Sequence, residues 1–486
     1  MFVIHITPEC APVAKAGGLG DVVQGLANEV AIRGNEVEVI LPKYDCMRYD
    51  RIWGLQKTYS DLWVPYYEHW VHCDVYFGFA DGIKCFFIEA HNDFFHRGCL
   101  YGEADDIQRF AFFCRAALEF ILKTGKNPDI IHCHDWQTAL VPILLFELYT
   151  RYGLTHPRVC YTLHNLGHQG ITGEFVLRQV GLDPAHYMTH DRLLDNFNPQ
   201  AVNLMKGGIT FSNFITTVSP RYMDEIRYSD QGKGLQHTLH LNEGKLGGIL
   251  NGVDYNSWNP ETDPHIPYTY SVETLDEKFN NKTALRYRLL LRDDYSPIVA
   301  VIARLDAQKG VHLIRHALFH CLDNGCQFVL LGSATDPAIN EEFWGLKHQF
   351  NDNPDCHLEL SYDEELSHLI YAGADMLIVP SAYEPCGLTQ MIALKYGTVP
   401  IVRNVGGLAD TVFDVNHAHK PYNERNGFVF NDLTEDGLNS ALDRAIGLWY
   451  EYPDYFKEVM VNGMQYDYSW NHPGEHYLNI YQHIIE

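Results

Sequence analysis

A glycine-rich turn between a strand pattern and a helix pattern stands near the start of the chain. Phe2–Thr7 is mostly apolar, which is typical of a buried strand. The turn follows as Ala14–Asp21 (AKAGGLGD), and apolar residues then recur at helical spacing up to Gly34, which is suited to end the helix. A strand, glycine-rich turn and helix together present backbone N–H groups to an anion. The pattern therefore predicts an open parallel sheet with a phosphate-bearing ligand at this turn.

Lys15 adds a positive charge within the same turn. The glycine spacing matches neither the dinucleotide fingerprint G-x-G-x-x-G nor the phosphate loop G-x-x-x-x-G-K-[ST]. The alternative is that the glycines only permit a tight strand-to-helix connection. Other motifs along the chain must decide between these two interpretations.

Length and charge limit the classes of function. A chain of 486 residues is too long for one ordinary core and predicts two or three domains. A net charge of −26 argues against nucleic acid or an anionic membrane as partner. No apolar segment is long enough to span a bilayer, and the N-terminus lacks the pattern of a signal or transit peptide. We therefore expect a cytoplasmic protein, or a protein of the plastid stroma if the chain comes from a plant or alga and a transit peptide has been removed.

The cysteines and histidines do not predict a metal site. The 12 cysteines include no C-x-x-C pair, which favours buried free thiols in a reducing compartment. His132 and His134 lie in one strand pattern and are expected to face opposite sides of the sheet, a poor geometry for binding one metal ion. We therefore expect neither a metal nor another cofactor.

Strand and helix patterns alternate through both halves of the chain and predict α/β architecture. The first series runs to residue 255, with an aromatic-rich stretch, 53–95, expected to be extended or antiparallel. A polar stretch, 259–275, reads as linker and loop. Continuous apolar runs then restart the pattern and are typical of parallel strands buried on both faces. We expect two Rossmann-like doubly wound domains, 1–255 and 256–465, facing a central cleft, and a helical segment, 466–486, that packs back on the first domain.

Charged side chains follow the strands of the second half. Arg304 and Lys309 come directly after a buried strand, and two cations in so acidic a chain favour a diphosphate over two solvent-facing charges. Glu384 follows another strand, where it is placed to contact a ligand or, alternatively, serves only as an acid near a helix N-terminus. In the first half, Asp135 and His164 follow adjacent strands and are expected to face the same cleft.

An internal similarity links the two halves. Asn404–Asp410 (NVGGLAD) resembles Lys15–Asp21 (KAGGLGD), and each follows or lies near a strand of its own half. We expect both turns to line one cleft, although two short glycine-rich turns can also be alike by chance.

The motifs together resemble the bacterial glycogen synthase and plant starch synthase family. They are, in order, KAGGLGDVV, HCHDWQT, TLHNLGHQG, TTVSP, GILNGVDYNSWNP, ARLDAQKG, YDEELSHL and EPCGLTQ, and they extend from about Phe2 to Trp470. The segment Leu41–Cys46 (LPKYDC) and the form of the first glycine motif are similar to the starch synthase III/IV-like branch that is shared with cyanobacteria.

The resemblance implies a GT-B architecture and glucosyl transfer from ADP-glucose to the non-reducing end of an α-1,4-glucan, with retention and without a metal. Arg304 and Lys309 would hold the diphosphate, while Lys15, Gly17 and Gly18 would close on the phosphates or the glucosyl group. Glu384 would contact sugar hydroxyls and His164 the donor glucose. The remaining donor residues would be Gly387, Leu388 and Thr389 at the phosphates and Tyr362 on adenine, and the acceptor residues Asp135, Trp136, Tyr101 and, beside it, Gly102. The alternative for Tyr362 is core packing.

Two points of mechanism stay open at the level of sequence. Many retaining GT-B enzymes carry a second acid eight positions after the first, whereas this chain has Ile392 there. No carboxylate pair is evident as nucleophile and acid/base, so we prefer a same-face route in which a leaving phosphate oxygen helps to deprotonate the acceptor. We also expect domain closure on donor binding. The alternatives are a UDP-glucose-preferring synthase, a pyridoxal-phosphate-type phosphorylase and a non-catalytic glucan-binding or priming scaffold.

Overall fold

The chain folds into two compact units. The computed structural model describes residues 1–350 and 352–486. Unit 1 comprises Met1–Gly252 together with Trp470–Glu486, and unit 2 comprises Val253–Ser469. The change of unit therefore lies at Gly252, where the sequence places it at residue 255, and the C-terminal segment returns to unit 1 from Trp470 rather than from residue 466.

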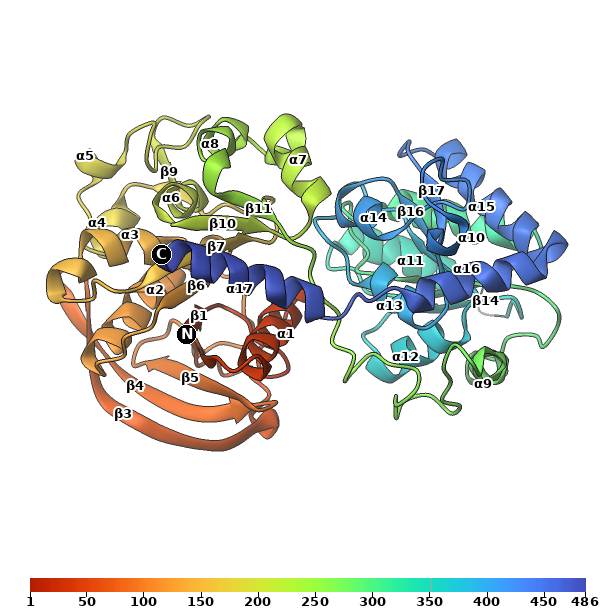
Figure 1. Ribbon diagram of the computed structural model, residues 1–486, viewed down its shortest axis with the longest axis horizontal. Helices are drawn as coiled ribbons and strands as arrows, with labels where there is room; N and C mark the ends of the chain where they lie inside the picture. Colours follow the sequence, from red (N-terminus) through yellow and green to blue (C-terminus); the bar gives the residue numbers. More distant parts are fainter. Residues whose placement is uncertain (351) are drawn as a thin grey trace. The chain divides into compact units, whose positions relative to one another are not determined.

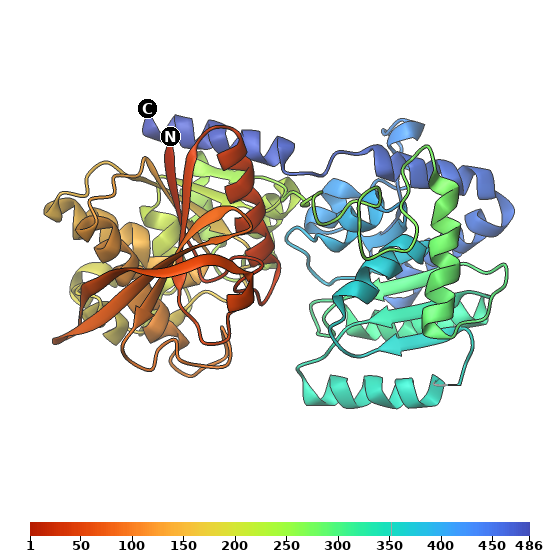
Figure 2. The same ribbon diagram turned by 90° about the horizontal axis from the view of Figure 1, so that it is seen from below.

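Unit 1 is built on a nine-stranded sheet of order β11-β10-β7-β6-β1-β2-β5-β4-β3. Its strands pair in parallel from β11 to β5, and β4 pairs antiparallel with both β3 and β5. The curved ribbon of β3 and β4 (Figures 1 and 2) corresponds to the aromatic-rich stretch that the sequence predicts to be extended or antiparallel. The strands are β1 (Phe2–Ile6), β2 (Glu36–Pro42), β3 (Ile52–Tyr66), β4 (His69–Ala80), β5 (Ile83–Ala90), β6 (Ile130–His134), β7 (Arg158–Leu163), β10 (Phe214–Thr217) and β11 (Leu246–Gly248), with β8 (Ile171–Gly173) and β9 (Ala201–Asn203) forming a separate antiparallel pair.

The C-terminal helix completes unit 1 by packing beside its first helix, as both ribbon views show (Figures 1 and 2). A Cβ on Gly25 would lie 1.9 Å from Nε1 of Trp470, so only glycine permits this approach. Arg33 also donates to the backbone and side-chain oxygens of Asn471. The helices of unit 1 are α1 (Gly18–Ile32), α2 (Asp106–Lys123), α3 (Leu140–Glu147), α4 (Phe175–Gln179), α5 (Pro184–Tyr187), α6 (Leu204–Phe211), α7 (Pro220–Tyr228), α8 (Gln236–Leu241) and α17 (Asn471–Ile485).

Unit 2 is built on a parallel six-stranded sheet of order β14-β13-β12-β15-β16-β17. Its central strands are buried along almost their whole length, which explains their continuous apolar sequences. The strands are β12 (Ile298–Ile302), β13 (Gln327–Leu331), β14 (Cys356–Glu359), β15 (Met376–Val379), β16 (Val399–Arg403) and β17 (Phe428–Phe430). The helices are α9 (Lys278–Leu289), α10 (Val311–Asp323), α11 (Pro337–Phe350), α12 (Glu364–Gly373), α13 (Thr389–Lys395), α14 (Gly406–Thr411), α15 (Glu435–Glu451) and α16 (Pro453–Gln465).

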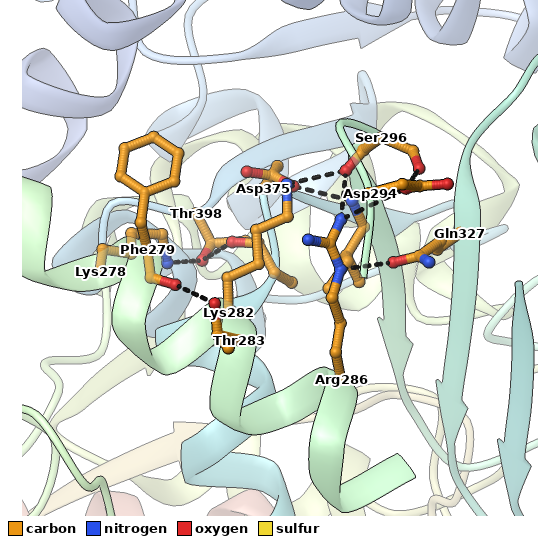
Figure 3. Close-up of polar contacts among 12 residues, drawn as sticks. Lys278, Phe279, Lys282, Thr283, Arg286, Asp294, Ser296, Gln327, Asp375 and Thr398 are labelled. Carbon is orange, nitrogen blue, oxygen red and sulfur yellow. Dashed lines mark hydrogen bonds and ion pairs between the residues drawn. The ribbon is translucent and has the colours of Figure 1, made fainter. Parts of the chain in front are cut away.

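A buried row of cations attaches α9 to the sheet of unit 2. Lys278, Lys282 and Arg286 are spaced four residues apart and therefore share one face of the helix (Figure 3). Lys282 forms an ion pair of 2.8 Å with Asp375, at the start of β15, and Arg286 donates to the carbonyl oxygen of Ser296. The row thus anchors the helix to the edge where β12 and β15 begin.

Lys278 lies at the end of this row without a carboxylate as hydrogen-bond partner among the described residues. Its ammonium group donates to the carbonyl oxygens of Tyr371 and Ala372 and to Oγ1 of Thr398 at 2.8–3.0 Å. Burial lowers the pKa of Lys278 to about 7, from an ordinary value of 10.5. Between these two pH values the unfolded chain binds a proton that the folded chain does not, so this group makes stability rise with pH.

Lys278→Met is expected to remove this pH dependence. The variant should lose a dependence of the free energy of unfolding on pH of at most about 1.4 kcal/mol per pH unit, which corresponds to one proton. The measurement is the thermal midpoint of the natural protein and the variant at several pH values from 6.5 to 9. The thermal midpoint of the natural protein should rise relative to that of the variant as the pH rises. Parallel curves would contradict the shifted pKa.

Candidate functional site

The glycine-rich turn of unit 1 folds around a buried carboxylate. Oε2 of Glu9 accepts the backbone N–H groups of Ala16 at 2.7 Å and Gly17 at 3.0 Å. The next residue, Gly18, is the first residue of α1. We expected the Gly17 amide to face a ligand, but in this structure it faces Glu9, because the protein supplies the anion itself. Glu9 therefore shapes the turn that carries Lys15.

Glu9 also connects the turn to a predicted acceptor residue. Its Oε1 accepts the hydroxyl of Tyr101 at 2.7 Å. Burial raises the pKa of Glu9, and its hydrogen bonds from Ala16, Tyr101 and Gly17 partly oppose that rise. Lys15 itself is exposed and forms an ion pair of 2.8 Å with Asp21 in the first turn of α1. The turn thus combines an internal anion with an exposed cation.

Asp135 and His164 lie together where β6 and β7 end. Oδ1 of Asp135 accepts the backbone N–H of His164 at 2.7 Å and, more weakly, that of Asn165 at 3.4 Å. Asp135 has φ 55°, a conformation that is uncommon for residues other than glycine. Burial raises the pKa of Asp135 to about 7, although the N–H groups of His164 and Asn165 act in the opposite direction. The sequence-based expectation that these two strand ends meet is confirmed.

Two predicted acceptor residues lie beside Asp135 on a shared aromatic support. Trp136 meets the ring of Phe110 edge-on at 5.8 Å, and Tyr101 packs on the same ring, also at 5.8 Å. Trp136 and Tyr101 are both half-buried. The structure therefore places Tyr101, Asp135 and Trp136 within one region of unit 1.

The predicted orientation of the two histidines in β6 is wrong. His132 and His134 are two residues apart, and side chains at that spacing lie on the same face of a strand. Their rings stack with centroids 4.3 Å apart, and His5 of β1 lies against both. His134 also reaches Nε2 of His164 through its Nδ1 at 3.0 Å. A buried group of four imidazoles therefore lies under the end of β7.

In unit 2, Lys309 and Glu384 form the central pair of the predicted donor site. Nζ of Lys309 lies 2.6 Å from Oε2 of Glu384, and the hydroxyl of Ser381 donates to the same oxygen at 2.8 Å. Side-chain exposure is 20% for Lys309 and 7% for Glu384, so water screens this pair weakly. Oε1 of Glu384 has no hydrogen-bond partner in the part of the chain that the structure describes, which leaves it as an acceptor for a ligand hydroxyl.

Glycine backbones bring three motifs of unit 2 into direct contact around that pair. Gly310, after Lys309, has φ 70°, and a Cβ there would lie 2.2 Å from the carbonyl oxygen of Pro380. A Cβ on Gly406 would lie 1.8 Å from the carbonyl oxygen of Glu384. The N–H of Gly407 donates to that same oxygen at 3.0 Å. The NVGGLAD motif therefore supports the EPCG turn of its own unit.

The other predicted donor residues of unit 2 lie at its surface or at a helix end. Arg304 is 65% exposed, with its guanidinium 3.8 Å from Asp306. Tyr362 is 79% exposed, which excludes the core-packing alternative. Gly387, with φ 77°, and Leu388 precede α13, and Thr389 begins it.

Sequence reasoning missed three residues that the structure places in these sites. Glu9 belongs to no recognised motif, although its position between a strand and the glycine turn was a usable signal. Ser381 lies two residues after the end of β15, where ligand-binding residues of parallel sheets often occur. His5 gives no local signal because its partners come from strands more than a hundred residues away.

Two family models match the chain. The first, the starch synthase catalytic domain, matches residues 2–241, and the second, glycosyl transferases group 1, matches residues 288–458. Glycogen synthase 1 of Nitrosococcus oceani is 72% identical over 486 residues, covering 100% of both chains. The chain belongs to the glycogen and starch synthase family. Glycogen synthase 2 of Methylococcus capsulatus is 63% identical over 99% of both chains, and glycogen synthase 1 of Synechococcus sp. strain JA-3-3Ab is 59% identical over 100% of this chain and 99% of that one.

Solved structures agree with this family. The catalytic domain of starch synthase IV from Arabidopsis thaliana, bound to ADP and acarbose, has a TM-score of 0.97 and 45% identity, and the alignment covers 100% of this chain and 99% of that one. Sucrose-phosphate synthase from Thermosynechococcus elongatus, at 18% identity and a TM-score of 0.63, shares the fold. The predicted GT-B architecture with two Rossmann-like domains is confirmed, as is the resemblance to starch synthase IV.

Family membership makes the chain a glycogen or starch synthase, an enzyme that elongates a glucan by glucosyl transfer. No helix in residues 1–350 or 352–486 is long and apolar enough to cross a membrane.

Proposed function

We propose that this synthase transfers glucose from ADP-glucose to the non-reducing end of an α-1,4-glucan, with retention at the anomeric carbon. The observation that carries the proposal is the buried Lys309–Glu384–Ser381 arrangement in unit 2. It holds a cation for the leaving group and a carboxylate for the sugar in one fixed place. The solved starch synthase IV, which binds ADP and acarbose, is consistent with a nucleotide donor and a glucan-like acceptor.

The leaving group in this proposal is ADP, and its diphosphate gains negative charge as the bond to glucose breaks. Lys309 donates one of its three N–H bonds to Glu384, so two remain for phosphate oxygens. Arg304 follows the same strand, β12, as Lys309 and adds a bidentate donor. Fixed donors stabilise such charge without reorganising. We propose that these two cations supply the charge that other transferases take from a divalent metal.

Glu384 is held for the glucosyl group rather than for proton transfer. Its Oε2 is occupied by Lys309 and Ser381, and Oε1 is available to accept a sugar hydroxyl. The carboxylate also favours the positive charge that develops on the sugar in an oxocarbenium-like transition state. We infer a same-face route, in which a phosphate oxygen of the leaving group takes the proton of the acceptor hydroxyl.

Asp135 and its neighbours are suited to position the acceptor. Oδ1 of Asp135 is occupied by backbone N–H groups, and Oδ2 has no hydrogen-bond partner within the described residues. Tyr101 and Trp136 add half-buried aromatic surface next to it, which is a common way to hold a sugar ring. These three side chains therefore fit a glucan end in unit 1, as the family resemblance implies.

The test of the donor is competition between ADP-glucose and UDP-glucose at equal concentration, with a malto-oligosaccharide acceptor and EDTA in the buffer. We expect chain elongation with ADP-glucose to be strongly preferred. A clear preference for UDP-glucose would overturn the donor assignment. Absence of elongation with either donor, together with retained glucan binding, would instead support the scaffold alternative.

A further inference from the structure

A row of hydrogen-bonded imidazoles connects the core of unit 1 to the end of β7. It consists of His5, His134 and His164, and we call it the histidine relay. His5 on β1, His134 on β6 and His164 after β7 come from three neighbouring strands of the sheet. Nδ1 of His5 lies 3.1 Å from Nε2 of His134. Nδ1 of His134 lies 3.0 Å from Nε2 of His164. His5 and His134 are fully buried, so water does not compete for these hydrogen bonds.

Each link of this relay requires one donor and one acceptor. Burial lowers the pKa of His5 and of His164 to about 3, and that of His134 well below its ordinary value, so all three rings are neutral near pH 7. A neutral imidazole carries a single N–H. His134 therefore donates to one neighbour and accepts from the other, which leaves only two directions for the whole relay.

The end of the relay distinguishes these directions. Nε2 of His5 is buried and has no hydrogen-bond partner among the described residues. If each N–H pointed inward, from His164 towards His5, Nε2 of His5 would carry a buried N–H without an acceptor. If each N–H points outward, from His5 towards His164, Nε2 of His5 is only an acceptor without a donor. Unsatisfied buried N–H groups are the rarer of the two defects, so the outward direction is favoured.

We propose that His5 and His134 are positioning residues that hold His164 in one tautomer, with its proton on Nδ1 for donation to a hydroxyl oxygen of the donor glucosyl group. In the outward direction His5 donates to His134, and His134 donates to Nε2 of His164. Nδ1 of His164 has no hydrogen-bond partner within the residues that the structure describes, and it is the nitrogen that remains for a ligand. This inference rests on the proposed function only in naming the sugar as that ligand.

The relay suits the charge that develops during the reaction. An imidazolium beside an oxocarbenium-like sugar would repel it, whereas a neutral N–H donor orients a hydroxyl without adding charge. Asp135 fixes the same residue from the other side, because its Oδ1 accepts the backbone N–H of His164. The backbone and the ring of His164 are thus held by separate partners, and the relay sets only the ring.

A metal ion is the competing explanation for this cluster. Suitable ligand atoms of His5, His132 and His134 lie within 4.8 Å of one another. However, both nitrogens of His132 already lie 2.7 Å from hydroxyl groups, one of Tyr481 and one of Thr162. A metal would have to displace these contacts, whereas the relay uses every contact as it stands.

The direct test is the ¹⁵N spectrum of the histidine-labelled natural protein, with the His164 signals assigned by their loss in His164→Gln. We expect Nδ1 of His164 to carry the proton and Nε2 to be unprotonated. The reverse pattern would overturn the proposal, and so would a change of these signals on addition of EDTA. This readout needs no turnover, so it remains valid even if the assignment of ADP-glucose fails.

Variants at His134 test the consequence for catalysis. His134→Leu should release the His164 ring and lower kcat about 100-fold with a donor KM within about threefold, because misorientation of about 1 Å has an effect of this size. His134→Asn retains an amide N–H near the position of Nδ1 and should recover most of the loss. The matched control is Tyr481→Phe, which removes a buried hydrogen bond from His132 outside the relay. Unchanged kcat and tautomer in His134→Leu, or an equal loss in Tyr481→Phe, would contradict the relay.

Discussion

Lys309→Ala is expected to lower kcat for glucosyl transfer about 1,000-fold, equivalent to about 4 kcal/mol of transition-state stabilisation. Lys309 is the less exposed of the two cations predicted to face the diphosphate, with 20% side-chain exposure against 65% for Arg304. Its charge therefore acts through a less screened medium. The measurement is the initial rate of ADP release at saturating donor and acceptor.

The control for Lys309→Ala is Lys347→Ala in the same unit. Lys347 is 25% exposed and lies 3.7 Å from Glu359, so it resembles Lys309 in burial and charge pairing but lies in no proposed site. Its kcat should stay within about twofold of the natural value. Because Lys309→Ala leaves Glu384 buried without its cation, Lys309→Ala/Glu384→Gln should restore stability but not activity. Recovery of activity in this double variant would show that Lys309 acts only by pairing with Glu384.

Asp135→Asn is expected to stabilise the protein above pH 7 while lowering its activity about 100-fold or more. Burial raises the pKa of Asp135 to about 7 in the folded protein, from 3.8. Between these values the folded state binds the extra proton, so stability falls as the pH rises through this window. The full effect corresponds to at most about 4 kcal/mol at pH 8. Asparagine has nearly the same size and shape as aspartate, keeps the acceptor for the His164 N–H and carries no charge to bury.

The loss of activity in Asp135→Asn has a different cause from the gain in stability. A hydrogen bond from a hydroxyl group to a carboxylate is about twice as strong as one to a neutral amide oxygen. The gain in thermal midpoint should be largest at pH 8, smaller at pH 5 and nearly absent below pH 3.8. The acceptor-dependent rate should fall strongly at pH 8 and much less at pH 5, where Asp135 of the natural protein is already protonated. A destabilised variant at pH 8 would contradict the raised pKa. Full activity would show that the Asp135 carboxylate does not position the acceptor.

Strand ends were the part of the site that the sequence predicted well. Lys309, Glu384, Asp135 and His164 each follow a buried strand, and parallel strands bring such positions to one edge of a sheet. The pairs Lys309–Glu384 and Asp135–His164 result from this rule together with the family resemblance. The fold was predictable for the same reason, because apolar runs and glycine turns repeat along both halves.

The sequence could not predict contacts that depend on register or on the path of a turn. The pairing of His5 opposite His132 requires the alignment of β1 with β6, which no local pattern encodes. The prediction that His132 and His134 face opposite sides is wrong because residues two apart in a strand lie on the same face. The glycine pattern indicates an N–H group available to an anion, but it does not indicate that Glu9, eight residues earlier, accepts the N–H of Gly17.

We propose that this chain forms new α-1,4 bonds from ADP-glucose. The most direct measurement is the anomeric signal of the product made from ADP-glucose labelled with ¹³C at C1 and a malto-oligosaccharide acceptor. We expect a labelled α-linked residue at the non-reducing end and stoichiometric release of ADP. A β-linked product, or release of labelled free glucose without chain elongation, would contradict it.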